Sequence, residues 1–405
     1  MKTTLASSKI MGLAQHIRPQ LIGLRRYLHQ HPELSGEEQQ TAQLMAERLT
    51  SLGLSVRTGV GGHGVVAQIS GEQPGRTVAY RTEMDALPLS DTLETDYASL
   101  ALGVSHACGH DVHMAVTWGT ARILAECKKD LHGQVRFILQ PAEEALDGAQ
   151  AMIAHGVLED PVPRALLALH TFPLPVGAIG LTPGCMLAGM EEFRVRFDAA
   201  EPALSVLIAS ALTSLNALNT ITPPETSPAF DALIARMVAG TGSEHTFYLS
   251  CWQNPNVFST DSHITGLVSL TDEKHRQRIR TDIQRTLDQV VKGTPATYEM
   301  WTSFTNPPVI NNAVLTAKLR PLVADIVGDK NVYWFRAPFP FAHEDFALYA
   351  QRIPASLLWL GTANQSRGIA RLLHTPDFDV DEEALVTGTA AAAYLLFSLS
   401  SMLAD

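Results

Sequence analysis

Residues 135–139, Val-Arg-Phe-Ile-Leu, form a short apolar run that begins after Gly133 and ends at Gln140 and Pro141. An apolar run of this length between turn-forming residues predicts a buried β-strand. Helices are expected near 112–127 and 148–155, and similar strand-like runs occur at Val65–Ile69, Thr77–Tyr80 and Ala165–Leu169. Short buried strands separated by helices of this length predict an α/β domain with a mostly parallel sheet and helices on both faces.

The N-terminal region has the spacing of two helices. The first is predicted to end before Pro32 and has one apolar face, formed by Ile17, Leu21, Leu24 and Leu28. Ser35 and Glu38 have the spacing of a capping box, which predicts the start of a second helix that stops at Gly53.

The pattern changes near residue 190. Phe193–Phe197 alternates like a half-exposed strand, and two strand–helix–strand units follow up to about residue 302. We expect these units to form a small α/β sandwich inserted into the larger domain. Past Pro307 the alternation of helices and buried strands resumes. The predicted organisation is a large domain in two segments, 1–189 and 305–405, with an inserted domain at 190–304.

Composition narrows the possible functions. The chain has 405 residues, which suggests two or three domains, and its 46% apolar and 18% charged residues exclude a disordered chain. Acidic residues outnumber basic ones, 41 against 30, so we expect no nucleic-acid or anionic-membrane partner. The four cysteines form no CxxC pair and the N-terminus has no secretory pattern, which favours a reducing, cytoplasmic location.

The C-terminal segment Ala384–Ala404 has no charged residue and is long enough to span a membrane. It also contains Thr387, Gly388, Thr389, Ser398, Ser400 and Ser401, and no Lys or Arg follows it. We therefore interpret it as a helix packed on the protein core.

Residues 105–113, Ser-His-Ala-Cys-Gly-His-Asp-Val-His, contain three histidines, a cysteine and an aspartate at a predicted strand-to-helix junction. Such junctions at the carboxyl edge of a parallel sheet are where α/β proteins place ligands. Thiolate and imidazole are good ligands for Zn²⁺ and similar ions, and the spacing of Cys108 and His110 lets both reach one centre. The alternative is a histidine-rich surface loop with one buried thiol.

Further candidates follow other predicted strands. In the adjacent pair Glu143 and Glu144, one carboxylate can bind a metal while the other acts as a base. His170 follows a predicted strand, and His374 comes after a long loop. Asp85 lies at another strand end, where a carboxylate either orients a ligand histidine or makes a local turn.

Taken in order, these stretches resemble peptidase family M20 of dinuclear metallohydrolases. Within the family, the likeness is to the amidohydrolase branch of aminoacylases, hippurate hydrolases and indole-acetyl-amino-acid hydrolases. The agreeing stretches are Arg-Thr-Glu-Met-Asp-Ala-Leu-Pro, His-Ala-Cys-Gly-His-Asp-Val-His, Gln-Pro-Ala-Glu-Glu, Ala-Leu-His-Thr-Phe-Pro and His-Glu-Asp-Phe-Ala, with the His374 segment. The resemblance implies a catalytic α/β domain and a lid domain, 190–304, that usually mediates homodimerisation.

The resemblance also implies a site and an activity. Cys108 would bridge two divalent ions (Zn, Mn, Co or Ni), and the other ligands would be His110, Glu144, His170 and His374. Glu143 would be the general base that passes a proton from water to the leaving nitrogen. Asp85 would orient a ligand histidine, and Asp111 and His113 would support the cluster. The implied reaction is hydrolysis of the amide bond of N-acyl amino acids or related small amides.

Three departures from the family pattern stand out. Glu83 replaces the usual aspartate ahead of Asp85, and His343 replaces a glycine before Glu344. We expect the side chains of His343 and Glu344 to contact substrate. Asn256 fits the family's asparagine motif in the lid and is a further candidate for substrate binding. The first lid strand, however, runs into residues 198–202, Asp-Ala-Ala-Glu-Pro, without the usual Gly-Gly-His-Ala. Loss of an oxyanion donor typically costs about 3 kcal/mol of transition-state stabilisation.

Two other functions remain open from the sequence. The missing lid histidine is compatible with a catalytically weak or inactive metal-binding member that acts as a ligand-binding or interaction protein. A cysteine hydrolase that uses Cys108 and a nearby histidine is the third hypothesis. Cysteine and histidine two residues apart on one loop cannot easily form a nucleophile–base pair, and no oxyanion signature accompanies them.

Overall fold

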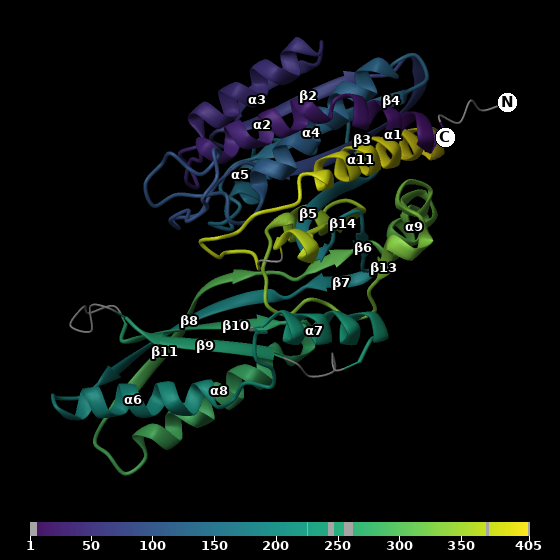
Figure 1. Cartoon of the computed structure of the whole chain (residues 1–405). Helices are drawn as coiled ribbons and strands as arrows, with labels where there is room; N and C mark the ends of the chain where they lie inside the picture. Colours follow the sequence, from purple (N-terminus) through teal and green to yellow (C-terminus); the bar gives the residue numbers. More distant parts are fainter. Residues whose placement is uncertain (1–5, 225, 242–246, 255–261, 370–371, 404–405) are drawn as a thin grey trace. The chain divides into compact units, whose positions relative to one another are not determined.

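A computed structural model describes residues 6–224, 226–241, 247–254, 262–369 and 372–403 (Figure 1). The chain divides into two compact units. Unit 1 comprises Met1–Gly184, Asn311–Trp334 and Leu348–Asp405, and unit 2 comprises Cys185–Ile310 and Phe335–Ala347. The domain limits drawn from the sequence at 190 and 304 stay predictions. Unit 2 also includes a short return segment, 335–347, that the sequence did not indicate.

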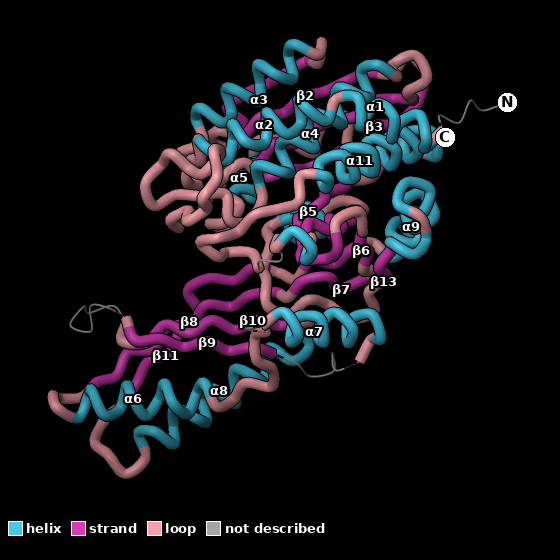
Figure 2. The backbone as a smooth tube through the Cα atoms, in the orientation of Figure 1, coloured by secondary structure: helices cyan, strands magenta, loops and turns pink. Residues whose placement is uncertain are grey.

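Unit 1 contains an eight-stranded sheet in the order β1-β2-β4-β3-β5-β14-β6-β13 (Figure 2). Its strands are β1 (Ser55–Val60), β2 (Gly64–Ser70), β3 (Gln73–Glu83), β4 (His132–Gln140), β5 (Leu166–Pro175), β6 (Ile179–Leu181), β13 (Val332–Trp334) and β14 (Ala355–Ala363). The central strands β4, β3, β5 and β14 pair in parallel, and antiparallel pairs join β1, β2 and β6 to them. This arrangement confirms the predicted α/β class with a mostly parallel sheet.

Helices cover both faces of this sheet. They are α1 (Ser7–His16), α2 (Arg18–Gln30), α3 (Gln39–Ser51), α4 (His110–Glu126), α5 (Gly148–Ala154), α9 (Ala313–Val327) and α11 (Glu383–Met402). Every one of them except α5 shares an apolar core with one face of the sheet. The other face carries buried Val66, Ile138 and Leu166, and α5 packs against β4 there.

The C-terminal helix α11 lies at the centre of the first core. Among the described residues, α11 is the one helix that is long and apolar enough to cross a membrane. However, 78% of its most apolar 18-residue window is buried. It packs against α4, where a Cβ added to Gly119 would lie 2.9 Å from Thr389. The apolar character of α11 is explained by this packing, as predicted.

Unit 2 contains a four-stranded antiparallel sheet in the order β11-β8-β10-β9. The strands are β8 (Gly189–Asp198), β9 (Phe247–Gln253), β10 (Ile264–Leu270) and β11 (Thr297–Asn306). Two helices, α6 (Ala203–Asn216) and α8 (Arg276–Val291), share one apolar core with the sheet, as expected for a small α/β sandwich. Other elements are α7 (Ser227–Ala239), α10 (Phe346–Ala350) and the paired strands β7 (Gly184–Leu187) and β12 (Val309–Asn311).

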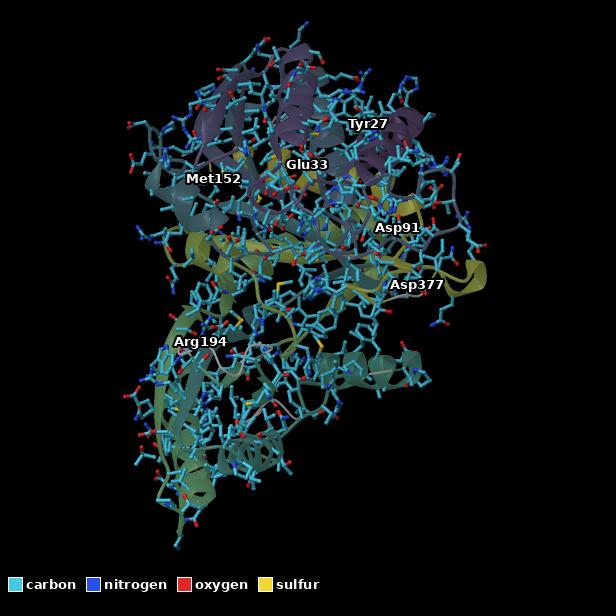
Figure 3. The ribbon with its side chains drawn as sticks, turned by 90° about the vertical axis from the view of Figure 1, so that its left-hand side faces the viewer. Tyr27, Glu33, Asp91, Met152, Arg194 and Asp377 are labelled. Atoms are coloured by element: carbon cyan, nitrogen blue, oxygen red, sulfur yellow. The ribbon has the colours of Figure 1, made fainter. Side chains whose placement is uncertain are left out.

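The predicted capping box at Ser35 and Glu38 is wrong. Glu38 precedes α3, but its side chain makes no cap hydrogen bond. Instead, the carboxylate of Glu33 (labelled in Figure 3) accepts hydrogen bonds from Gln40 N at 3.1 Å and Thr41 N at 2.8 Å. Because Glu33 already satisfies these free N–H groups, Ser35 and Glu38 bond elsewhere. The sequence analysis also missed α1, β1, β6, β7 and β12, which are short or carry no clear apolar pattern.

The outer edge of β9 is closed by side chains from the end of α6 and the turn after it. The three side chains are those of Asn216, Asn219 and Thr220. The Asn219 amide donates to Leu249 O at 2.7 Å and accepts from Leu249 N, and the Asn216 amide bonds Cys251 in the same two-way manner at 3.2 and 3.0 Å. These bonds replace those that an added strand would make, so the β9 edge is protected from strand pairing.

We predict that Asn216→Ala combined with Asn219→Ala opens this edge. Four backbone groups of Leu249 and Cys251 lose their partners, so the free energy of unfolding should fall by about 1–3 kcal/mol. Species of higher mass than the wild type should form at equal concentration, as measured by denaturant unfolding and light scattering. Thr213→Ala, an exposed change on the same helix, is the control. A double variant that matches the wild type in both measurements would contradict edge protection.

Candidate metal centre

The predicted metal-binding residues of unit 1 converge at the carboxyl ends of its central strands. Asp85 follows β3, Cys108 precedes α4, which begins at His110, and Glu143 and Glu144 follow β4. His170 lies within β5 rather than after it, because this strand continues to Pro175. This is the edge at which parallel α/β sheets gather their functional groups.

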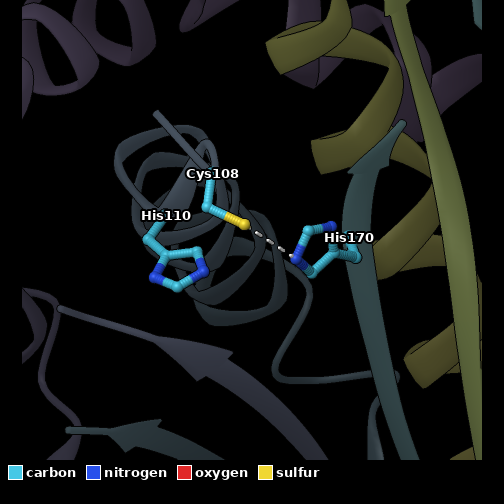
Figure 4. A group of neighbouring side chains, drawn as sticks. All are labelled: Cys108, His110 and His170. Atoms are coloured by element: carbon cyan, nitrogen blue, oxygen red, sulfur yellow. Dashed lines mark hydrogen bonds between the residues drawn. The ribbon is translucent and has the colours of Figure 1, made fainter. Parts of the chain in front are cut away.

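Cys108 is the centre of this cluster. Its Sγ lies 3.5 Å from His170 Nε2 (Figure 4) and 3.3 Å from His374 Nε2. The neighbouring Gly109 has φ +83°, and a Cβ there would lie 2.6 Å from Thr171 Oγ1. Only glycine fits this position, where Thr171 Oγ1 donates to the carbonyl of Cys108 at 2.8 Å.

Among the groups of three possible ligands in the described residues, two share the sulfur of Cys108. One group is Cys108, His110 and His170, and the other is Cys108, Glu144 and His374; within each group the ligand atoms lie within 4.8 Å of one another. Thiolate, imidazole and carboxylate are ligands that suit Zn²⁺ and related divalent ions. Two ions bridged by one thiolate would therefore fit these residues.

Unsatisfied polar atoms support this fit. His110 Nδ1 donates to the carbonyl of Asp85 at 2.8 Å, which leaves His110 Nε2 buried with no hydrogen-bond partner. Glu144 Oε1 is also buried without one. His170 Nδ1 donates to the carbonyl of Thr171 at 2.8 Å, so its Nε2 is the nitrogen that faces Cys108. A divalent cation would satisfy atoms that otherwise cost free energy to bury.

The electrostatics of the cluster favour positive charge. Burial lowers the pKa of His110, but the hydrogen bond and charge of Asp85 raise it to about 10. Burial, together with the charges of Glu144 and Glu143, raises the pKa of the Cys108 thiol well above its usual value. The surroundings thus hold protons on both side chains, and metal ions would take the place of those protons.

Asp85 is fully buried and fixes three neighbours. Its backbone carbonyl accepts from His110, and its Oδ2 accepts from Ser35 Oγ at 2.7 Å and from Glu144 N at 2.8 Å. Burial raises the pKa of Asp85, but the close approach and charge of His110, together with the bonds from Ser35 and Glu144 N, outweigh burial and hold the pKa below its usual value. Ser35 was missed from the sequence because its spacing with Glu38 fitted a helix cap.

His113 supports the cluster without offering a free nitrogen. Its Nδ1 donates to Glu83 at 2.8 Å, and its Nε2 accepts from Thr171 N at 2.8 Å. Burial raises the pKa of Glu83, but Arg81 and His113 together hold it well below its usual value. The longer acid at position 83 is therefore part of a buried Arg81–Glu83–His113 chain beneath the ligands.

Asp111 anchors the start of α4 through Arg25. Arg25 Nε and His29 Nδ1 each donate to Asp111 Oδ2 at 2.8 Å, and Arg25 Nη2 donates to Asp379 Oδ1 at 3.0 Å. This buried arginine ties α2 to the ligand helix and to the segment that follows His374. The sequence analysis missed the role of Arg25. A charged residue next to the apolar face of α2 could have indicated a buried ion pair.

Glu143 and Glu144 lie close to the ligand histidines. Glu143 is buried, and its Oε2 is 3.9 Å from His110 Nε2. Glu144 Oε1 lies 3.9 Å from His110 Nε2 and 3.6 Å from His374 Nε2. The backbone is in the left-handed region at Ala142 and at His374, with φ +52° and +62°, and such strain concentrates at functional sites.

The predicted substrate-binding residues belong to unit 2 or fall outside the described residues. Asn256 lies outside them. His343 Nε2 bonds Ser269 Oγ at 2.8 Å, and burial lowers the pKa of His343 to about 4, so its ring is neutral at pH 7. Glu344 Oε1 accepts from Phe346 N at 2.9 Å.

Comparisons with known proteins identify the family of the chain. The sequence profile of peptidase family M20/M25/M40 matches residues 79–398. A probable hydrolase of Synechocystis sp. is 34% identical over 95% of this chain and 97% of its own length. N-acetyl-L-cysteine deacetylase of Bacillus subtilis is 32% identical over 96% of this chain and 89% of its own length.

A solved structure gives the same result. The Bacillus subtilis YXEP protein, described as a dinuclear metal-binding peptidase from the M20 family, has a TM-score of 0.73 and 27% identity, covering 96% of this chain and 99% of its own. The two chains thus share an architecture over almost their whole length. The profile match and the identity to the curated relatives lead to one conclusion: this chain belongs to peptidase family M20/M25/M40 and is a hydrolase.

Proposed function

We propose that the chain hydrolyses the amide bond of N-acyl amino acids or related small amides. The observation that carries this proposal is the pair of ligand groups that share Cys108 Sγ, with the Glu143 carboxylate beside them. The similarity to a deacetylase of N-acetyl-L-cysteine supports an N-acyl amino acid as the substrate class.

Each side chain has a role in the proposed reaction. Cys108, His110, His170, Glu144 and His374 would hold two divalent ions, Zn, Mn, Co or Ni. Such ions, when bound, polarise a scissile carbonyl and lower the pKa of water. Glu143 takes a proton from the attacking water and later gives it to the leaving nitrogen. Asp85 fixes the tautomer of His110 through its backbone carbonyl, which leaves Nε2 as the nitrogen that would bind an ion.

We propose substrate contacts, an assembly and a location from separate features of the chain. Glu344, His343 and Asn256 are the proposed substrate-binding residues of unit 2. The proposed assembly is a homodimer through unit 2; since the β9 edge is closed, the contact would use another part of that unit. The four unpaired cysteines support a cytoplasmic location.

A second candidate is a metal-binding protein with little hydrolytic activity. In the described part of unit 2, β8 ends at Asp198 and α6 begins at Ala203 without an intervening histidine. His263 is buried, and its Nδ1 accepts from Phe197 N at 3.0 Å. No histidine from the expected loop is therefore available to stabilise the oxyanion. Tight metal binding without turnover on N-acetyl, N-benzoyl and dipeptide substrates would favour this candidate.

Glu143→Gln tests the proposed base. The amide cannot accept the proton, so kcat should fall by about 10²- to 10⁴-fold while the two ions remain bound. The measurements are kcat on N-acetyl amino acids and metal content by elemental analysis. Glu126→Gln, an exposed change at the far end of α4, is the control. Unchanged turnover in Glu143→Gln would refute the assignment of the base.

Metal removal tests the centre itself. Dialysis against a chelator should abolish hydrolysis, and added Mn²⁺, Zn²⁺ or Co²⁺ should restore it. The ions stabilise the fold by mass action, by about 2.7 kcal/mol at 100 times Kd, so the chelated protein should also unfold at a lower temperature. Activity that resists chelation but is lost on alkylation of Cys108 would instead indicate a cysteine hydrolase.

A further inference from the structure

We propose that Ser35 and Glu38 are positioning residues that hold the loop of Glu143 and Glu144 in its active conformation. The proposal rests on the proposed hydrolysis for its catalytic consequence, and on the metal centre for its binding consequence. Both residues lie in the turn before α3, about a hundred residues away from the loop in sequence.

Glu38 fixes the start of the loop. Its side chain is completely buried, and Oε1 accepts from Gly36 N at 3.0 Å and from Ala142 N at 2.7 Å. Ala142, which directly precedes Glu143, has φ +52°. A residue other than glycine in this region costs on the order of 1–2 kcal/mol, so the turn needs an external contact to hold it. Glu38 supplies that contact.

Ser35 fixes the second carboxylate through Asp85. Its hydroxyl donates to Asp85 Oδ2 at 2.7 Å, and the same oxygen accepts from Glu144 N at 2.8 Å. Without the serine, Asp85 Oδ2 loses one of its two donors and can rotate away from the Glu144 backbone. The turn therefore holds the loop at two points, Ala142 N and Glu144 N, on either side of Glu143.

Packing on the outer side of the loop is too sparse to replace these bonds. A cavity of about 650 Å³ borders the loop at Ala142 and Ala145, and the residues facing them across it include Ser35, Gly36, Gly61 and Gly62. Small side chains around an open cavity give few van der Waals contacts. The position of the loop thus depends on hydrogen bonds more than on packing.

The bonds require an acceptor at position 38 but not a charge. Glutamine places a carbonyl oxygen where Glu38 Oε1 lies, so Glu38→Gln should keep both hydrogen bonds. Glu38→Ala removes them. A role as a negative charge predicts a different order of effects, because Glu38→Gln would then lose function as Glu38→Ala does.

The test compares Glu38→Ala, Glu38→Gln and Ser35→Ala in the full chain. Co²⁺ titration of the metal-free protein, followed by absorption, should show that Glu38→Ala and Ser35→Ala lose about 10- to 100-fold in affinity for one of the two ions, the one in the group with Glu144. The other ion should bind as in the wild type. On N-acetyl-L-methionine, kcat should fall by a similar factor with KM changed by less than about twofold. Glu38→Gln should restore both quantities to near wild type.

Controls separate this proposal from folding effects and from the proposed function. Glu37→Ala changes the exposed neighbour of Glu38 and should have no effect. If Glu38→Ala does not fold, the same measurements on Ser35→Ala and Glu38→Gln decide the proposal. If the wild type binds two ions but cleaves no amide, the proposed function fails, while the Co²⁺ titration still decides the present proposal. Wild-type Co²⁺ binding in both Ala variants, or equal loss in Glu38→Gln and Glu38→Ala, would overturn it.

Discussion

Buried Asp85 is the residue on which the candidate metal centre depends, through both its backbone carbonyl and its carboxylate. Its backbone carbonyl selects the tautomer of His110, and its Oδ2 holds the Glu144 backbone. One residue thus orients a ligand from each of the two groups that share Cys108. Because a buried carboxylate is costly without hydrogen bonds, the two bonds that Asp85 Oδ2 accepts tolerate little rearrangement.

A second constraint is charge. Glu83, Asp85, Asp111 and Glu143 are all buried close to the ligands, and the chain offsets part of this charge with buried Arg25 and Arg81. Arg25 bonds Asp111, and Arg81 bonds Glu83. Glu143 and Glu144 lie beside His110, and divalent ions would be a natural counter-charge for their carboxylates.

The sequence predicted the elements better than their connections. Strand ends with His, Glu and Cys could be recognised because apolar runs such as 135–139 stop directly before them. The hydrogen bonds between Ser35 and Asp85 and between Ala142 N and Glu38 could not be recognised from the sequence. The spacing of Ser35 and Glu38 equally fitted a helix cap, and the residue that caps the helix, Glu33, comes earlier. Likewise, the amides that close β9 come from α6, and periodicity carries no information about contacts between elements.

The proposed roles of the two units differ, and this difference decides which step the missing lid histidine would affect. Every residue of the two groups that share Cys108, and the proposed base, belongs to unit 1, so the proposed metal binding and proton transfer would use side chains of that unit. Unit 2 lacks a histidine between β8 and α6, and its His263 is already bonded to Phe197 N. On the proposed function, a change confined to unit 2 would alter transition-state stabilisation and substrate choice while leaving the proposed ligands intact. Metal affinity and turnover are therefore separable properties of this chain, and a low rate on one amide would not count against the metal centre.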